Sequence, residues 1–127
     1  MNNTTLYSII ASPLHRDCSS LYQKLNIDST EFTSVRQAIK HLKQHPPDVV
    51  VADFIYGYGN NYAGVNISNL DVFLYALQKQ APNAKVIVFA EKTELTFVDK
   101  LKELFDIHRV LVYPISDSEL ENALRDN

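Results

Sequence analysis

The sequence contains one cysteine, three glycines and no tryptophan among its 127 residues. A single cysteine, Cys18, excludes an internal disulfide and is typical of a reducing compartment. No apolar run is long enough to span a bilayer, and the opening MNNTTLYSIIASPLHRD lacks the basic start of a signal peptide. We therefore expect a soluble cytoplasmic protein that does not interact with a membrane.

Excess charge is also lacking: 12 basic and 15 acidic residues leave a net charge of −3, so we expect no nucleic-acid partner. The four histidines are His15, His41, His45 and His108. They show no ligand spacing with one another or with Cys18, and we expect no metal site. Two of them lie beside Lys40 and Lys43, a patch that we interpret as the solvated face of a helix.

Short apolar runs alternate with segments of helical period along the whole chain. The expected strands are residues 6–11, 31–35, 48–52, 85–90 and 109–113. The expected helices are residues 14–25, 35–45, 70–80 and 93–105, with a last helix that begins at Ser116, where Ser116 and Glu119 have capping-box spacing. Five such units predict a single α/β domain over residues 1–127, with helices on both faces of a parallel sheet.

The carboxyl ends of parallel strands share one edge of the sheet, and function gathers at that edge in such folds. Ser12, Asp53, Ala90 and Tyr113 all follow or close an expected strand there. We therefore expect these four residues to lie close together.

Two segments, HPPDVVVAD (45–53) and VYPISDSEL (112–120), together with the order of elements, resemble a response-regulator receiver domain of the CheY-like type. The resemblance covers nearly the whole chain. It implies a flavodoxin-like (βα)5 three-layer sandwich with strand order 2-1-3-4-5. It also places Asp53 at the position of the phosphorylated aspartate.

The receiver pattern is broken at one short stretch and at two single positions. Ala11, Ser12 and Pro13 stand where receivers carry an acidic pair for Mg²⁺, Ala90 replaces a serine or threonine, and Tyr113 replaces a lysine. A tyrosine donates one hydrogen bond but brings no positive charge at neutral pH. Asp53 is therefore interpreted as a vestigial phosphoacceptor that fixes the turn, and the alternative, a reactive nucleophile, requires an unusual cation site.

All three glycines fall within one eight-residue stretch (57–64) of the loop after Asp53, which also carries Tyr56, Tyr58 and Tyr62. Tyrosines on such a loop offer contact area at a low entropic cost. The loop is thus a candidate interaction surface, and the alternative is a surface loop whose tyrosines pack on the neighbouring helix. A nucleotide pocket is disfavoured because no glycine-rich turn runs into a helix with a lysine.

The main hypothesis is a degenerate receiver-like domain that binds another signalling protein, or a second copy of itself, without phosphorylation. It needs no cofactor, is not an enzyme, and acts in bacterial signal transduction or transcriptional control. The face that the resemblance implies comprises Lys100, Glu103, His108, Tyr113 and Glu119. Two alternatives remain: a Mg²⁺-dependent phosphoacceptor that a histidine kinase phosphorylates on Asp53, and a small-ligand sensor that uses the strand-end cleft.

Overall fold

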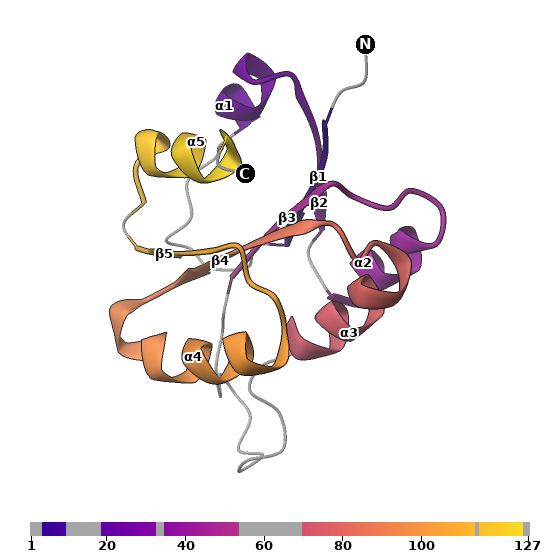
Figure 1. The fold of residues 1–127 in the computed structure, drawn as a ribbon. Coiled ribbons are helices and arrows are strands. Elements are labelled where there is room, and N and C mark those ends of the chain that lie inside the picture. The colour runs from indigo at the N-terminus through magenta and orange to yellow at the C-terminus, as the bar shows by residue number, and fades with distance from the viewer. Residues whose placement is uncertain (1–3, 10–18, 33–34, 54–69, 114, 126–127) are drawn as a thin grey trace.

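The computed structural model describes residues 4–9, 19–32, 35–53, 70–113 and 115–125 (Figure 1). Its strands are β1 (Thr4–Ile9), β2 (Ile27–Phe32), β3 (Val49–Asp53), β4 (Lys85–Ala90) and β5 (Arg109–Val112). Its helices are α1 (Ser19–Lys24), α2 (Val35–Leu42), α3 (Leu70–Gln80), the short 3₁₀ helix η1 (Lys92–Glu94), α4 (Leu95–Leu104) and α5 (Asp117–Arg125). None of these helices is long and apolar enough to cross a membrane.

The five strands form one parallel sheet in the order β2-β1-β3-β4-β5. Helices α1 and α5 cover one face, and α2, α3 and α4 cover the other, as Figure 1 shows. The predicted three-layer α/β fold and strand order are confirmed.

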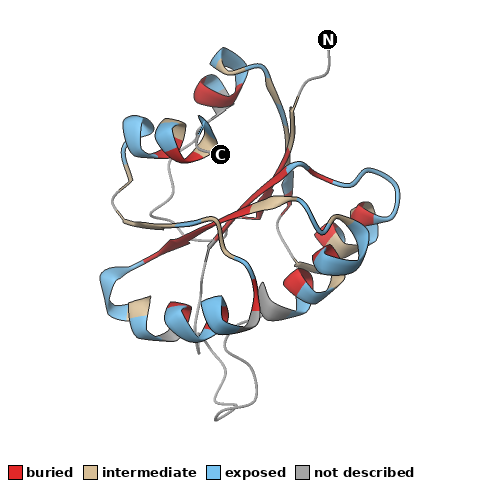
Figure 2. Ribbon diagram, in the orientation of Figure 1, coloured by how far each residue is buried: buried red, intermediate tan, exposed pale blue. Residues whose placement is uncertain are grey.

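The core has two layers, one on each face of the sheet (Figure 2). Three consecutive valines of β3 show how one strand serves both layers. Val50 packs in the layer under α2, α3 and α4, whereas Val49 and Val51 pack in the layer under α1 and α5. Because successive side chains of a strand point to opposite faces, a central strand must be apolar throughout, as VVVA is.

The second strand begins earlier than the sequence indicates, at residue 27 instead of 31. As an edge strand it pairs only with β1, so its outer residues remain polar and IDSTEF lacks a strong apolar signature. Asn26, immediately before it, has φ of 60°, a left-handed conformation that asparagine tolerates and that ends the turn after α1. The expected start at residue 31 is therefore wrong, and Val35, the expected last residue of the strand, begins α2; residues 33–34 lie outside the described residues.

Most other predicted boundaries agree with the structure within a few residues. The first strand begins at residue 4 instead of 6, and its expected last residues, 10 and 11, lie outside the described residues. The second helix ends at Leu42 instead of continuing to His45. Beyond Leu42 one helical turn persists, since the amide of His45 donates to the carbonyl of His41 at 3.0 Å. The expected helices at 70–80 and 93–105 and the strand at 85–90 are confirmed.

The start of α5 confirms the predicted capping box. The amide of Glu119 donates to Ser116 Oγ at 3.1 Å, and the amide of Ser116 donates to Glu119 Oε1 at 3.1 Å. Each side chain thus satisfies a backbone donor that the helix itself leaves unpaired.

Candidate functional site

Three of the four predicted strand-end residues lie on adjacent strands of the sheet. Asp53 closes β3 opposite Phe89, and Ala90 closes β4 opposite Val112. The amide of Tyr113, just after β5, donates to the carbonyl of Ala90 at 3.0 Å. The backbone therefore brings Asp53, Ala90 and Tyr113 to the same edge, as the sequence predicted.

The remaining calls near this edge lie outside the described residues. These are Ser12 and Pro13 after β1 and the three loop tyrosines, Tyr56, Tyr58 and Tyr62. For Asp53 the structure describes the strand position but not the side chain. Its assignment as a vestigial phosphoacceptor stays a prediction.

Ala90 is completely buried and belongs to the core layer under α2, α3 and α4. Its methyl group supplies no hydroxyl to an oxyanion at the strand end. A larger polar side chain at this position has to displace core atoms or shift the backbone, because interiors are closely packed. The structure thus makes Ala90 a packing residue.

Tyr113 is half-buried, and its ring packs on the opposite face of the sheet, in the layer under α1 and α5. It meets the ring of Phe89 edge to face, with the centroids 5.8 Å apart and the planes at 81°. This arrangement is a favourable aromatic pair. Tyr113 therefore contributes ring packing at a position where receivers place a cation.

The loop after β4 carries charge of both signs. Glu91 and Lys92 are exposed, and the amide of Glu91 donates to Glu94 Oε1 at 3.0 Å in the turn of η1. Within the described residues there is no group of three or more histidine, cysteine or acidic side chains that could hold a metal ion.

The predicted interaction face lies around the edge strand β5, which pairs only with β4. Figure 1 shows α4 on one side of this strand and α5 on the other. Lys100 and Glu103 are exposed on α4, and Glu119 is exposed on α5 but is engaged in the helix cap. His108 is half-buried, and its Nε2 is buried without a hydrogen-bond partner among the described residues, so this atom contributes no contact to a partner.

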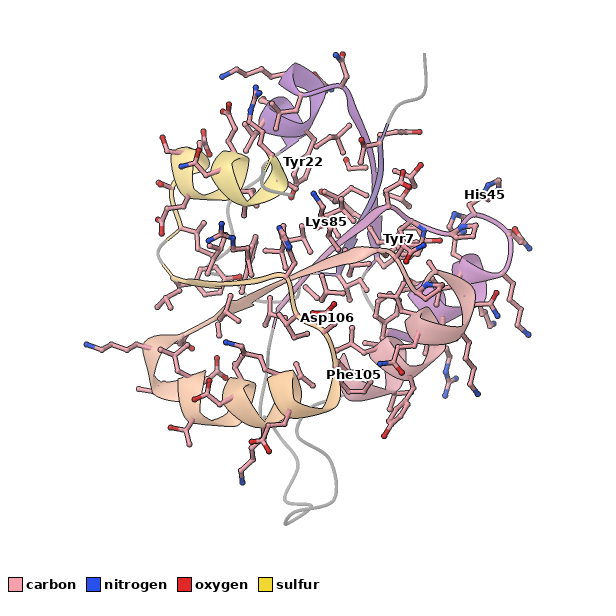
Figure 3. All side chains as sticks on the ribbon, viewed as in Figure 1. Tyr7, Tyr22, His45, Lys85, Phe105 and Asp106 are labelled. Carbon is pink, nitrogen blue, oxygen red and sulfur yellow. The ribbon has the colours of Figure 1, made fainter. Side chains whose placement is uncertain are left out.

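The sequence did not predict a cluster formed by Tyr7, His41 and His45. Tyr7 is fully buried in β1, and its hydroxyl donates to the backbone carbonyl of His45 (Figure 3). Burial raises the pKa of Tyr7 from 10.0 to about 12. The ring of His41 lies 5.7 Å from Tyr7 and 5.3 Å from His45, between centroids. The four-residue spacing of the histidines was the signal, and it was interpreted only as a solvated helix face.

No protein-family model and no curated protein matches the chain. Solved structures do match it. The chemotaxis response regulator CheY4 of Vibrio cholerae is 15% identical with a TM-score of 0.74, and the match covers 98% of each chain. The signal receiver domain of an HD domain-containing protein from Pseudomonas fluorescens Pf-5 is 19% identical with a TM-score of 0.72, over 98% of this chain and 93% of that one.

A response regulator receiver domain protein from Clostridium thermocellum is 16% identical with a TM-score of 0.66, over 97% of this chain and 92% of that one. At such identities the likeness concerns the fold and leaves the activity open. The likeness nevertheless extends over almost the entire chain and includes the strand order. The chain has the CheY-like fold of response-regulator receiver domains.

Proposed function

We propose that this chain is a degenerate receiver-like domain that acts by binding another protein and does not depend on phosphorylation. The observation that carries the proposal is the packing of Ala90 and Tyr113. Ala90 is fully buried in the core at the position where a receiver carries a hydroxyl. Tyr113 packs its ring on Phe89 at the position where a receiver carries a cation. Both side chains pack against the sheet, and neither supplies the serine or threonine hydroxyl or the positive charge that receivers place there.

Electrostatics supports the same conclusion. Phosphoryl transfer to an aspartate gathers negative charge that a Mg²⁺ ion and a cationic side chain normally offset. Mg²⁺ binds through carboxylates and water in a strict octahedral arrangement. The residues after β1 read Ala11, Ser12 and Pro13 and include no acid. Asp53 is then left without the partners that make a strand-end carboxylate reactive, and no catalysis or cofactor is proposed.

The surface proposed for the partner is formed by α4, β5 and α5. Its exposed charges have both signs, with Lys100 and Glu103 on α4, so it suits a protein surface better than a polyanion. The partner is another protein of a bacterial signalling or transcriptional pathway, or a second copy of this chain, in the cytoplasm. The glycine- and tyrosine-rich loop after Asp53 is the second surface proposed.

The proposal is tested by incubating the purified chain with a small-molecule phosphodonor, with and without Mg²⁺, and measuring its intact mass. An Asp53→Asn variant is the matched control. We expect no added phosphoryl group in either protein. A Mg²⁺-dependent gain of one group that the control lacks would overturn the proposal and make the chain an active phosphoacceptor.

The interaction surface is tested by charge reversal. Lys100→Glu combined with Glu103→Lys keeps the net charge but exchanges the signs on α4. Sedimentation velocity over a range of concentrations measures self-association. The matched control is Lys40→Glu with Glu31→Lys, which exchanges two exposed charges, on α2 and on β2 at the opposite edge of the sheet from β5. If two copies pair through α4, the variant with Lys100→Glu and Glu103→Lys stays monomeric, whereas the wild type and the control associate. Equal association of both variants places the contact elsewhere.

A further inference from the structure

The loop between α2 and β3 brings two imidazoles together. His41 lies in the last turn of α2, and the helical turn that continues past the end of the helix places His45 on the same side. The ring centroids are 5.3 Å apart and the ring planes differ by 36°. His45 is exposed and His41 is half-buried, so the pair faces water on one side.

This separation fits two ligands of one metal ion. Histidines four residues apart on one helical face are a known zinc-binding arrangement. Two imidazole nitrogens bound at about 2.1 Å to a tetrahedral ion put the ring centroids about 5 Å apart. The observed centroid distance of 5.3 Å agrees with that value.

The surrounding packing holds the ring of His41 and the backbone of His45 in place. His41 lies against Phe32 at 5.4 Å and against Tyr7 at 5.7 Å, so its ring is braced from the core side. The backbone of His45 is fixed twice, by its amide bond to His41 and by the hydroxyl of buried Tyr7, which donates to its carbonyl. A site held by such outer contacts binds more tightly than a flexible one, because less order must be gained on binding.

The charge around the histidine pair is unfavourable for a cation, but the repulsion is weak. Lys40 and Lys43 are both exposed, and water and salt screen their repulsion of a cation. The described residues supply no third histidine, cysteine or acidic ligand. An ion held here therefore keeps at least two positions open to water or to another donor, and it binds with the affinity of a two-ligand chelate.

We propose that His41 and His45 form a bidentate site for a divalent transition-metal ion. Imidazole is a good ligand for Zn²⁺, Ni²⁺ and Cu²⁺ and a poor ligand for Mg²⁺. We expect the site to bind Cu²⁺ more tightly than either Ni²⁺ or Zn²⁺. The site lies at the amino end of β3, whereas Asp53 closes the carboxyl end of the same strand. It is thus separate from the proposed function and does not depend on it.

The test is a calorimetric titration of the tag-free chain with Cu²⁺, Ni²⁺ and Mg²⁺. We expect one Cu²⁺ and one Ni²⁺ per chain and no binding of Mg²⁺. His45→Gln removes one exposed ligand without touching the core, and we expect at least about a tenfold loss of affinity. His108→Gln is the matched control, because it deletes an imidazole outside the pair. Its affinities for Cu²⁺ and Ni²⁺ should equal those of the wild type.

A second measurement separates binding at the pair from binding elsewhere. An ion that binds only the folded chain raises its unfolding midpoint, so Ni²⁺ should raise the midpoint of the wild type and of His108→Gln but not of His45→Gln. Unchanged Ni²⁺ affinity in His45→Gln, or the same midpoint shift in all three proteins, would overturn the proposal. So would the absence of any binding to the wild type.

Discussion

The hydroxyl of Tyr7 donates a hydrogen bond to the backbone carbonyl of His45, which ties the middle of β1 to the loop that leads into β3, 38 residues along the chain. The tyrosine is fully buried, and its ring also packs on Phe32 with the centroids 4.8 Å apart. A buried carbonyl or hydroxyl without a partner is costly. This bond therefore holds the start of the loop against β1, while the bonds between Asp48 and Thr5 hold its end.

The first prediction concerns the stability of the protein in alkali. Burial raises the pKa of Tyr7 to about 12, so the folded chain keeps its phenol proton where an unfolded chain, with a pKa of 10.0, has lost it. Folding therefore favours the neutral phenol. Its contribution to the free energy of unfolding is complete below about pH 10 and is lost as the pH rises towards 12. We expect the free energy of unfolding to fall by about 2 to 3 kcal/mol over this window through Tyr7.

Urea unfolding at several pH values measures this decline, and Tyr7→Phe is the matched variant. The variant should lose about 1 kcal/mol or slightly more at neutral pH, because the carbonyl of His45 loses its donor. It should then show a shallower alkaline decline than the wild type. Parallel curves for the two proteins would contradict the assignment of the alkaline transition to Tyr7.

The second prediction concerns the packing at Ala90. Ala90→Thr restores the hydroxyl that receivers carry but inserts two heavy atoms at a fully buried position. We expect the substitution to lower the free energy of unfolding by about 1 to 3 kcal/mol. Thermal and urea unfolding measure the loss.

The matched control for this variant is Ala84→Thr, which makes the same change at a half-buried residue just before β4. Its cost should be smaller. If Ala90→Thr were tolerated without loss, the strand-end edge would have room for a guest group, and the small-ligand sensor would become the better hypothesis.

The third prediction concerns the cap of α5. Ser116→Ala removes the oxygen that accepts the amide of Glu119, and we expect a loss of about 1 kcal/mol in the free energy of unfolding. Ser118→Ala, in the first turn of the same helix and exposed, is the control and should cost much less. Equal losses in chemical denaturation would show that the hydrogen bond to Ser116 adds nothing.

The fourth prediction concerns the two ion pairs of Glu121, one with Lys24 of α1 and one with Arg125 within α5. Glu121 accepts from Arg125 at 2.9 Å and lies 3.5 Å from Lys24 Nζ, and both cations are more than half exposed. Because water screens such pairs, Glu121→Gln should cost less than about 1 kcal/mol. The loss should shrink in 1 M salt, when urea unfolding is compared at two ionic strengths. A loss that is independent of salt would mean that Glu121 acts through packing.

The architecture was predictable because its signals are local and repeated. Two-faced apolar strands such as VVVA and KVIVFA occur only where both sides are covered, and the alternation with helical periods then requires a parallel sheet. Ser116 and Glu119 likewise mark the start of α5 by their spacing alone. The edge strand β2 was misplaced because an edge needs fewer apolar residues and leaves a weaker signature.

The sequence by itself determined the α/β class, the edge where Asp53, Ala90 and Tyr113 gather, and the loss of acids after the first strand. Only the tertiary structure decided that Ala90 is sealed in the core and that Tyr113 packs on Phe89, because burial depends on elements far apart in the chain. It alone also showed how Tyr7 braces the pair His41 and His45. Spacing along a helix places side chains on one face, but only the packing of β1 against the α2–β3 loop fixes how close their rings lie.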